Sequence, residues 1–268
     1  EEARRAGEVA RLLEEIPQFD AAKTLLVDLA RLDSKGNIAL ADFLSRHGTL
    51  VQSLEQCQMA LKEAPVNVVL PIAVNALRNH RSEAGAEHYA RVEKWLNQIL
   101  EKDPNGKITK FQLAALRDLS GRCDEAIKIY RELLTRGDLT ETEQATIANN
   151  LAYLLAMAGQ DTEEAFNLVN RAIKILGPSP ELLDTLALTF LASGQVETAI
   201  TNLEKAILDN PSGIKHFHLA LAYQMLNDQK AAKQHLREAV EGYQLTATQL
   251  SQIEREKYRK LVEWVEAK

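Results

Sequence analysis

The sequence predicts an all-α solenoid, in which helical hairpins of about 34 residues stack along the chain. Three observations support this fold class: small and apolar residues return at that period, a turn residue separates the two helices of each unit, and proline closes several units. The pattern is clearest between Pro180 and Pro211. There the chain carries Leu186, Ala187, Phe190, Gly194, Ala199, Leu203 and Ala206. A hairpin of this kind leaves one apolar face uncovered, so hairpins stack until a capping element ends the array.

Each position of the pattern has a physical role. Leu186 and Phe190 are four residues apart, so they lie on one face of a helix. Ala187 and Ala199 are small where two helices approach closely, because larger side chains would force the helices apart. Gly194 can adopt a positive φ, which ends the first helix and begins the turn.

The same pattern occurs before and after this unit. The preceding unit carries Leu151, Ala152, Leu155, Gly159, Ala165, Val169 and Ala172. The following unit carries Leu219, Ala220, Tyr223, Asn227, Ala232, Leu236 and Ala239. A fair match upstream carries Leu113, Ala114, Gly121, Ala126, Tyr130 and Leu133. A further unit carries Leu40, Ala41, Leu44, Gly48, Ser53, Cys57, Ala60 and Pro65.

Two segments depart from the pattern. The unit between Pro65 and Pro104 has a hairpin loop several residues too long, and Pro71 falls inside its first helix. Proline disrupts a helix interior, so we expect a kink or a late helix start there. Residues 1–33 are expected to form a degenerate helical pair on either side of Pro17.

The remaining boundaries follow from local signals. Thr140 is expected to cap a lengthened first helix, with Glu143 three residues later. We therefore expect tandem repeats over residues 34–245 and a capping helix over 246–268, in one continuous domain. The apolar stripe of the last helix should pack on the final hairpin. As an alternative, Trp264 and its neighbours form a dimer contact.

These residues and spacings resemble the tetratricopeptide repeat family. The resemblance implies a right-handed superhelix of about six to seven hairpins plus the terminal helix. Residues 149–156 are similar to bacterial members of the family. In such proteins the first helices line a concave groove that binds extended peptides or helices. By position, the partner-binding residues here would be Asn149, Asn150, Tyr153, Met157, Asp184, Leu188, Phe217, His218, Leu221 and Met225.

Two features of these positions bear on the ligand. Apolar side chains such as Phe217 and Leu221 are not demanded by repeat packing, so their presence favours a contact role. Asn150 stands where some family members bind a ligand backbone, although both asparagines could instead bond within the helix ends. Members that clamp an acidic C-terminal tail use paired basic residues, whereas the corresponding positions here are Phe111, Asn149, Asp184 and Phe217. Such a tail is therefore a poor candidate.

Composition limits the other function classes. The net charge is −6 and basic residues form no cluster, so we expect no nucleic-acid partner. No apolar stretch approaches the ~18 residues of a membrane span. We also expect no cofactor, metal or catalytic site. His216 and His218 point about 200° apart on a helix and are expected to be solvent or groove histidines.

The resemblance implies a scaffold or adaptor that binds a protein or peptide, and not an enzyme. The chain should be a monomer or a weak homodimer. Two alternatives stay open: a structural spacer or self-association unit, and a regulatory repeat region of a longer protein with an enzymatic or DNA-binding domain elsewhere. The chain starts at Glu1 without an initiating Met, so we expect a processed protein or a piece of something longer.

Overall fold

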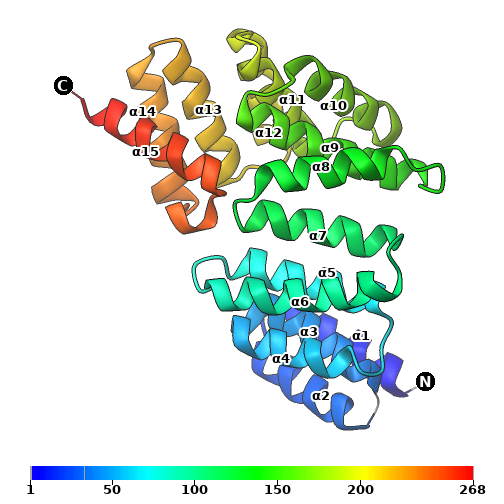
Figure 1. Ribbon diagram of the computed structural model, residues 1–268. Coiled ribbons are helices and arrows are strands. Elements are labelled where there is room, and N and C mark those ends of the chain that lie inside the picture. Colours follow the sequence, from blue (N-terminus) through cyan, green and yellow to red (C-terminus); the bar gives the residue numbers. More distant parts are fainter. Residues whose placement is uncertain (1, 33, 268) are drawn as a thin grey trace. The chain divides into compact units, whose positions relative to one another are not determined.

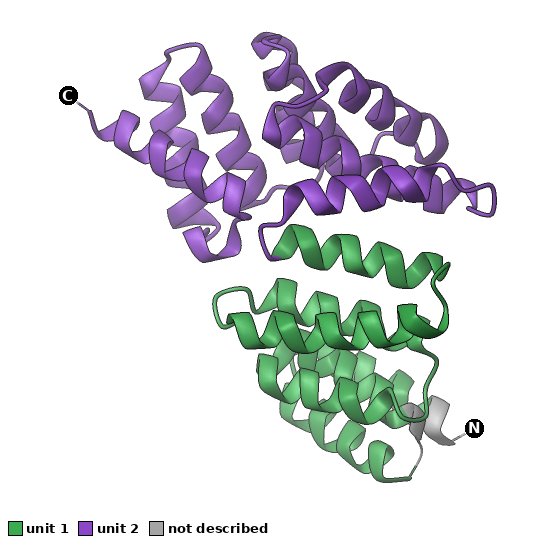
Figure 2. Ribbon diagram, in the orientation of Figure 1, with its two compact units in different colours: residues 1–119 green, residues 120–268 purple. Residues whose placement is uncertain are grey.

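The computed structural model describes residues 2–32 and 34–267 (Figure 1). Within these residues the chain forms fifteen α-helices and no β-strand, which confirms the all-α prediction. None of the described helices is both long and apolar enough to cross a membrane. The helices form two compact units, residues 1–119 and 120–268, and each unit is described by itself (Figure 2). The number of hairpins and the single continuous domain stay predictions.

The first unit contains seven helices. They are α1 (Glu2–Glu15), α2 (Phe19–Leu32), α3 (Ser34–His47), α4 (Leu50–Ala60), α5 (Val66–Asn79), α6 (Ala86–Lys102) and α7 (Lys107–Leu119). The predicted pair around Pro17 is present as α1 and α2. The predicted long loop is also present, since residues 80–85 connect α5 to α6. A late helix start at Pro71 is wrong, because α5 begins at Val66 and continues through that proline. A kink there stays a prediction.

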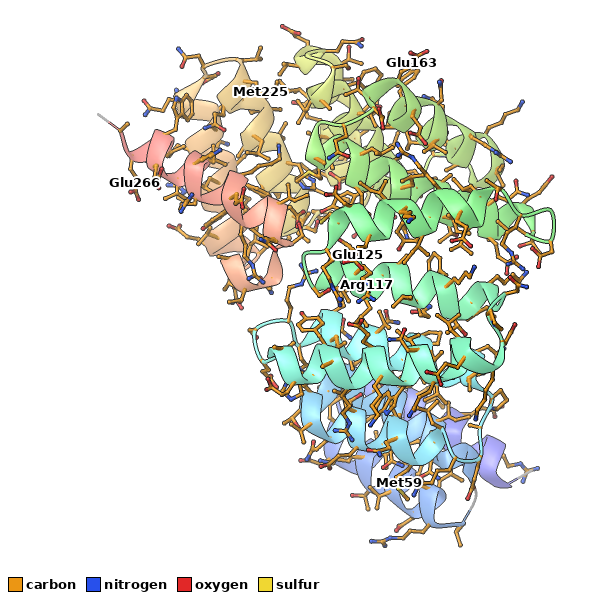
Figure 3. All side chains as sticks on the ribbon, viewed as in Figure 1. Met59, Arg117, Glu125, Glu163, Met225 and Glu266 are labelled. Carbon is orange, nitrogen blue, oxygen red and sulfur yellow. The ribbon has the colours of Figure 1, made fainter. Side chains whose placement is uncertain are left out.

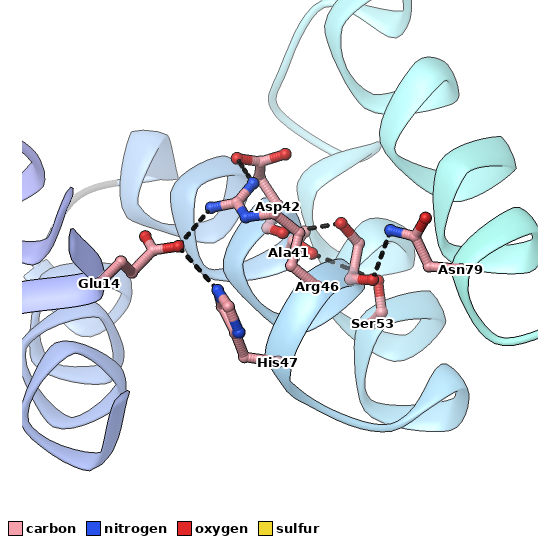
Figure 4. A network of polar contacts seen from close by, with 8 residues as sticks. Glu14, Ala41, Asp42, Arg46, His47, Ser53 and Asn79 are labelled. Carbon is pink, nitrogen blue, oxygen red and sulfur yellow. Dashed lines mark hydrogen bonds and ion pairs between the residues drawn. The ribbon is translucent and has the colours of Figure 1, made fainter. Parts of the chain in front are cut away.

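Polar contacts join successive hairpins of this unit (Figure 4). Glu14 on α1 accepts hydrogen bonds from Arg46 Nη2 at 2.8 Å, and its carboxylate lies 3.1 Å from His47 Nε2; both partners are on α3. Asn79 on α5 donates to the Ser45 carbonyl at 2.9 Å. The partners are separated by 32 to 34 residues along the chain. The repeat period therefore places equivalent positions of neighbouring hairpins side by side.

The second unit contains eight α-helices. They are α8 (Cys123–Leu134), α9 (Glu141–Ala158), α10 (Thr162–Leu176), α11 (Pro180–Ala192), α12 (Val196–Asp209), α13 (Gly213–Met225), α14 (Gln229–Arg237) and α15 (Gln252–Glu266). A π-helical turn, Glu238–Gly242, extends α14, and a 3₁₀ turn, Ala247–Gln249, precedes α15. The predicted terminal helix is thus present, but it begins only at Gln252.

The predicted start and stop signals act as expected in this unit. Thr140 caps α9, and its side chain and that of Glu143 form a reciprocal capping box. Gly159 and Gly194 have φ values of 65° and 78°, in the left-handed region that glycine adopts without steric cost. Asn227 holds the same position in the last repeat with φ 59°. The turn after the first helix is therefore conserved in geometry along the unit.

The small residues of the repeat lie where helices pack most closely. Ala187 on α11, Ala199 and Ala206 on α12 and Ala220 on α13 are all 0% exposed. Ala187 and Ala199 share one hydrophobic cluster with Leu203. Since interiors are packed to near crystal density, no room remains at these positions for a larger side chain.

We predict that Ala199→Leu lowers the free energy of unfolding by about 1–3 kcal/mol, because overpacking must displace α11 from α12. The matched control is Thr201→Leu on the exposed side of the same helix, which should stay within about 0.5 kcal/mol of the wild type. Urea denaturation followed by circular dichroism measures both. Equal effects of the two substitutions would show that close packing at Ala199 is not limiting.

Candidate partner-binding site

The first helices of the second unit's last three hairpins, α9, α11 and α13, carry all ten predicted partner-binding residues. We call the surface formed by these positions the first-helix face. The structure divides the ten residues by exposure. Half of them are buried: Met157, Leu188, Phe217, His218 and Leu221. The half-buried ones are Asn149, Asn150, Tyr153 and Asp184, and only Met225 is exposed, by 51%, at the end of α13 (Figure 3).

The expectation that packing leaves the apolar residues of this face free is therefore wrong. Met157 and Leu188 pack into the hydrophobic cluster between the hairpins. Phe217 and Leu221 pack against residues of the terminal helix, and the Phe217 ring lies 5.8 Å from that of Tyr258. The reason is that α15 not only caps the last hairpin but also covers the α13 part of the first-helix face.

A charged cluster joins α15 to this face. His218 on α13 is 0% exposed, and its two ring nitrogens face carboxylates from two other helices. Nδ1 lies 2.8 Å from Asp184 Oδ1 on α11, and Nε2 lies 3.4 Å from Glu254 Oε1 on α15. Because both nitrogens face acceptors, the ring is doubly protonated and positively charged.

Glu254 caps the first turn of α15. Its Oε2 accepts a hydrogen bond from the Ser251 backbone N–H at 2.6 Å, and the Ser251 hydroxyl accepts one from the Glu254 N–H at 3.2 Å. This is a reciprocal capping box, which satisfies two donors at the start of the helix. The same carboxylate also accepts a hydrogen bond from the side chain of Tyr153 on α9. The Glu254 side chain therefore caps the N-terminus of α15 and also contacts two first helices, α9 and α13.

The cluster shifts the pKa values of its members strongly. Burial opposes a charge on His218, but Asp184 and Glu254 outweigh it and raise the pKa of the imidazole to about 10. Burial likewise opposes the charge on Glu254, yet hydrogen bonds from His218 and Tyr153 lower the pKa of this carboxyl to about 2. Both groups are ionised at neutral pH.

The structure thus brings Tyr153, Asp184 and His218 together, and it adds Glu254, which the sequence analysis missed. One signal for part of the cluster was available. Asp184 and His218 are 34 residues apart, one repeat period, so opposite charges at these positions predict a contact. Glu181 and Lys215 have the same separation and lie 3.5 Å apart.

The expectation that His216 and His218 are solvent or groove histidines is also wrong, because both are buried. His216 is buried, and its ring stacks between those of His235 and Tyr243, at centroid distances of 5.4 and 5.3 Å. Its Nδ1 lies 3.2 Å from that of His235. Burial lowers the pKa of His216, and burial together with the neighbouring His216 lowers that of His235. Two neutral, stacked rings are a packing element of the last hairpin.

Comparison with known families identifies the repeats. The tetratricopeptide repeat description matches residues 114–180 and again residues 216–244. These two segments include the predicted units on which α9 and α13 lie. The chain is a tetratricopeptide repeat protein.

Solved structures agree with this fold. A tetratricopeptide repeat protein from Parabacteroides merdae superimposes with a TM-score of 0.68 at 14% identity, over 99% of both chains. A chain of the APC/C hetero-tetramer Cut9–Hcn1 gives 0.60 at 15% identity, over 90% of this chain and 46% of that one. A thermophilic tetratricopeptide repeat protein of Thermus thermophilus gives 0.51 at 15% identity, over 66% and 92%. The predicted fold class is confirmed. No curated protein matches the sequence.

Part of the first-helix face of this tetratricopeptide repeat protein stays open. On α9 the accessible residues Thr142, Thr146, Asn149, Asn150 and Tyr153 fall on one stripe. The stripe ends at Tyr153, where α15 begins to cover the face. Asn150 Nδ2 lies 3.4 Å from the Tyr130 hydroxyl. In the part of the chain that the structure describes, Asn149 Oδ1 is buried and has no hydrogen-bond partner.

The charged cluster predicts an unusual pH dependence. Folding raises the pKa of His218, so its contribution to stability is complete below about 6.5 and is lost as pH rises toward about 10. Between pH 7 and 9, we expect the free energy of unfolding of the wild type to fall by about 1.4 kcal/mol more per pH unit than that of His218→Gln. Guanidinium denaturation at several pH values measures the two slopes. His216 and His235 are neutral in the folded chain over this window and cancel in the comparison.

Glu254 contributes to stability with the opposite pH dependence. Folding lowers its pKa, so its contribution is complete above about 4.5 and is lost as pH falls toward about 2. For His218, the contradicting result is an equal pH dependence of the free energy of unfolding in the wild type and His218→Gln between pH 7 and 9. That result would show that the buried imidazole carries no charge.

Proposed function

We propose that this chain is a protein-interaction scaffold whose second unit binds a protein or peptide partner on the open part of the first-helix face. The fold supports the coarse statement, because tetratricopeptide repeat proteins generally serve as interaction scaffolds. The site itself is supported by one observation: the polar stripe of Thr142, Thr146, Asn149, Asn150 and Tyr153 on α9 stays accessible beside the part of the face that α15 covers.

The chemistry of the stripe favours an extended peptide backbone. Asn149 and Asn150 each offer an acceptor and two donors, which match the alternating N–H and C=O groups of a peptide. Asp184 on α11 is already paired with His218 and offers no free charge, whereas exposed Met225 offers an adaptable apolar contact. The partner should therefore contribute backbone hydrogen bonds.

Other parts of the sequence interpretation stay predictions. They include the absence of a nucleic-acid partner, the monomeric or weakly dimeric state, the spacer role and the role as a regulatory repeat region. Trp264, the proposed dimer contact, packs partly buried against the cluster of the last hairpin. Its substitution would consequently disturb the cap as well as any dimer.

We predict that Asn149→Ala combined with Asn150→Ala abolishes partner capture, because it removes the hydrogen-bonding groups of the stripe. Helix content should be unchanged, since among the described residues the only side-chain hydrogen bond lost is the 3.4 Å contact from Asn150 to Tyr130. Affinity capture with mass-spectrometric identification measures the loss. The matched control is Asn167→Ala on the exposed side of α10, which should retain every partner. A partner retained by the double variant would place the site elsewhere.

An acidic C-terminal tail peptide should not bind. The accessible first-helix face presents amides and the Asp184 carboxylate, and its buried Lys215 is paired with Glu181. Titration calorimetry with such a peptide should give no measurable heat of binding. Micromolar affinity would contradict the proposed chemistry of the site.

A further inference from the structure

We propose that the part of the first-helix face that α15 covers, which we call the seat of α15, is itself a partner-binding surface. In this structure α15 occupies the seat as a built-in ligand. The partner in this view is a helical protein segment that begins with an apolar residue, a serine or threonine cap and a glutamate three residues after the cap. This proposal rests on the proposed function, because it extends the same face from α9 to α13.

The segment at the start of α15 contacts the face as a ligand would. Leu250 is fully buried in the cluster with Phe217, and Ile253 packs against the neighbouring cluster, against which Tyr153 also packs. Ser251 and Glu254 are also buried. In contrast, Gln252 is exposed. The first-helix face thus contacts the apolar, cap and acidic positions of the segment, which are Leu250, Ser251 and Glu254.

The contacts come from three separate hairpins. Tyr153 lies on α9, Asp184 on α11 and His218 on α13, and all three act on the single Glu254 carboxylate directly or through the imidazole. A helix that only capped the last hairpin would need no contact with Tyr153 on α9 or Asp184 on α11. Binding one side chain by groups from successive first helices is how a face of this fold recognises a ligand.

The energetics favour recognition over simple stability. A buried ion pair contributes little net stability compared with apolar packing, but it discriminates strongly against a ligand that lacks the matching charge. An all-apolar contact would hold α15 equally well. The charged cluster therefore specifies which segment can occupy the seat.

The connection to α14 explains why α15 fills the seat. Leu245, near the start of the connection, is buried in the last hairpin's cluster, so only the residues after it need to move for α15 to leave. A short connection holds a tethered ligand at an effective concentration of the order of millimolar. A separate partner must compete with α15, and it binds measurably once the tethered copy is weakened.

The test uses the full chain and a fluorescently labelled peptide with the sequence of residues 246–266. Binding is measured by anisotropy to the wild type, to Glu254→Gln and to the control Glu256→Gln, whose residue is exposed on the same helix. We expect the peptide to bind the Glu254→Gln chain at least tenfold more tightly than the other two. A peptide carrying the Glu254→Gln change should lose at least tenfold of that affinity.

Hydrogen exchange of the α15 amides accompanies the binding experiment. In the Glu254→Gln chain these amides should exchange faster, while those of α11 stay protected. Ser251→Ala, which removes the hydroxyl cap and keeps the carboxylate, should produce a smaller effect in the same direction.

The proposal would be overturned by no gain in peptide binding although α15 exchanges faster, by unchanged exchange in the Glu254→Gln chain, or by equal binding of both peptides. Conversion of the Glu254→Gln chain to a dimer without peptide binding would assign the seat to a second copy and would also overturn it. Partner capture that still depends on Asn149 and Asn150 would then leave the proposed function intact, so the two failures are distinguishable.

Discussion

Each hairpin of this chain leaves an apolar face that only another helix can cover closely, and most of the structure follows from this constraint. Fully buried alanines such as Ala187 and Ala199 let the helices meet. The fixed period then aligns equivalent positions, so polar contacts recur at separations near one repeat, as between Asp184 and His218. In the described part of the chain α15, and not another repeat, follows the last hairpin and covers it.

The way in which α15 covers that face connects the fold to function. Apolar contacts with Phe217 would satisfy the packing requirement alone. The chain adds Glu254, which must lose its hydration and be matched by His218 inside the protein. Because such burial is costly unless every partner is present, the charged cluster fixes one seat for α15. The same cluster leaves the stripe of α9 open beside it.

The repeat pattern predicted the fold well because it records packing directly. Gly194, Ala199 and the Thr140 capping box act through local geometry or through the neighbouring helix, so spacing alone reveals them. The candidate site was predicted less well. Phe217 was expected to be free because the repeat does not use it, yet a helix outside the repeat covers it. Glu254 follows His218 by 36 residues, two more than the repeat period, and it lies on a helix outside the repeat pattern, so its contact with His218 depends on the tertiary path of α15.

The most direct test of this account is a double-mutant cycle between His218 and Glu254. Both single glutamine variants and the double variant would be compared by the free energy of α15 opening, measured by hydrogen exchange. If the two charges together hold the helix on the first-helix face, the coupling energy should exceed about 1 kcal/mol, within the usual range for contacting residues. Additive effects within about 0.3–0.5 kcal/mol would mean that apolar packing alone seats α15.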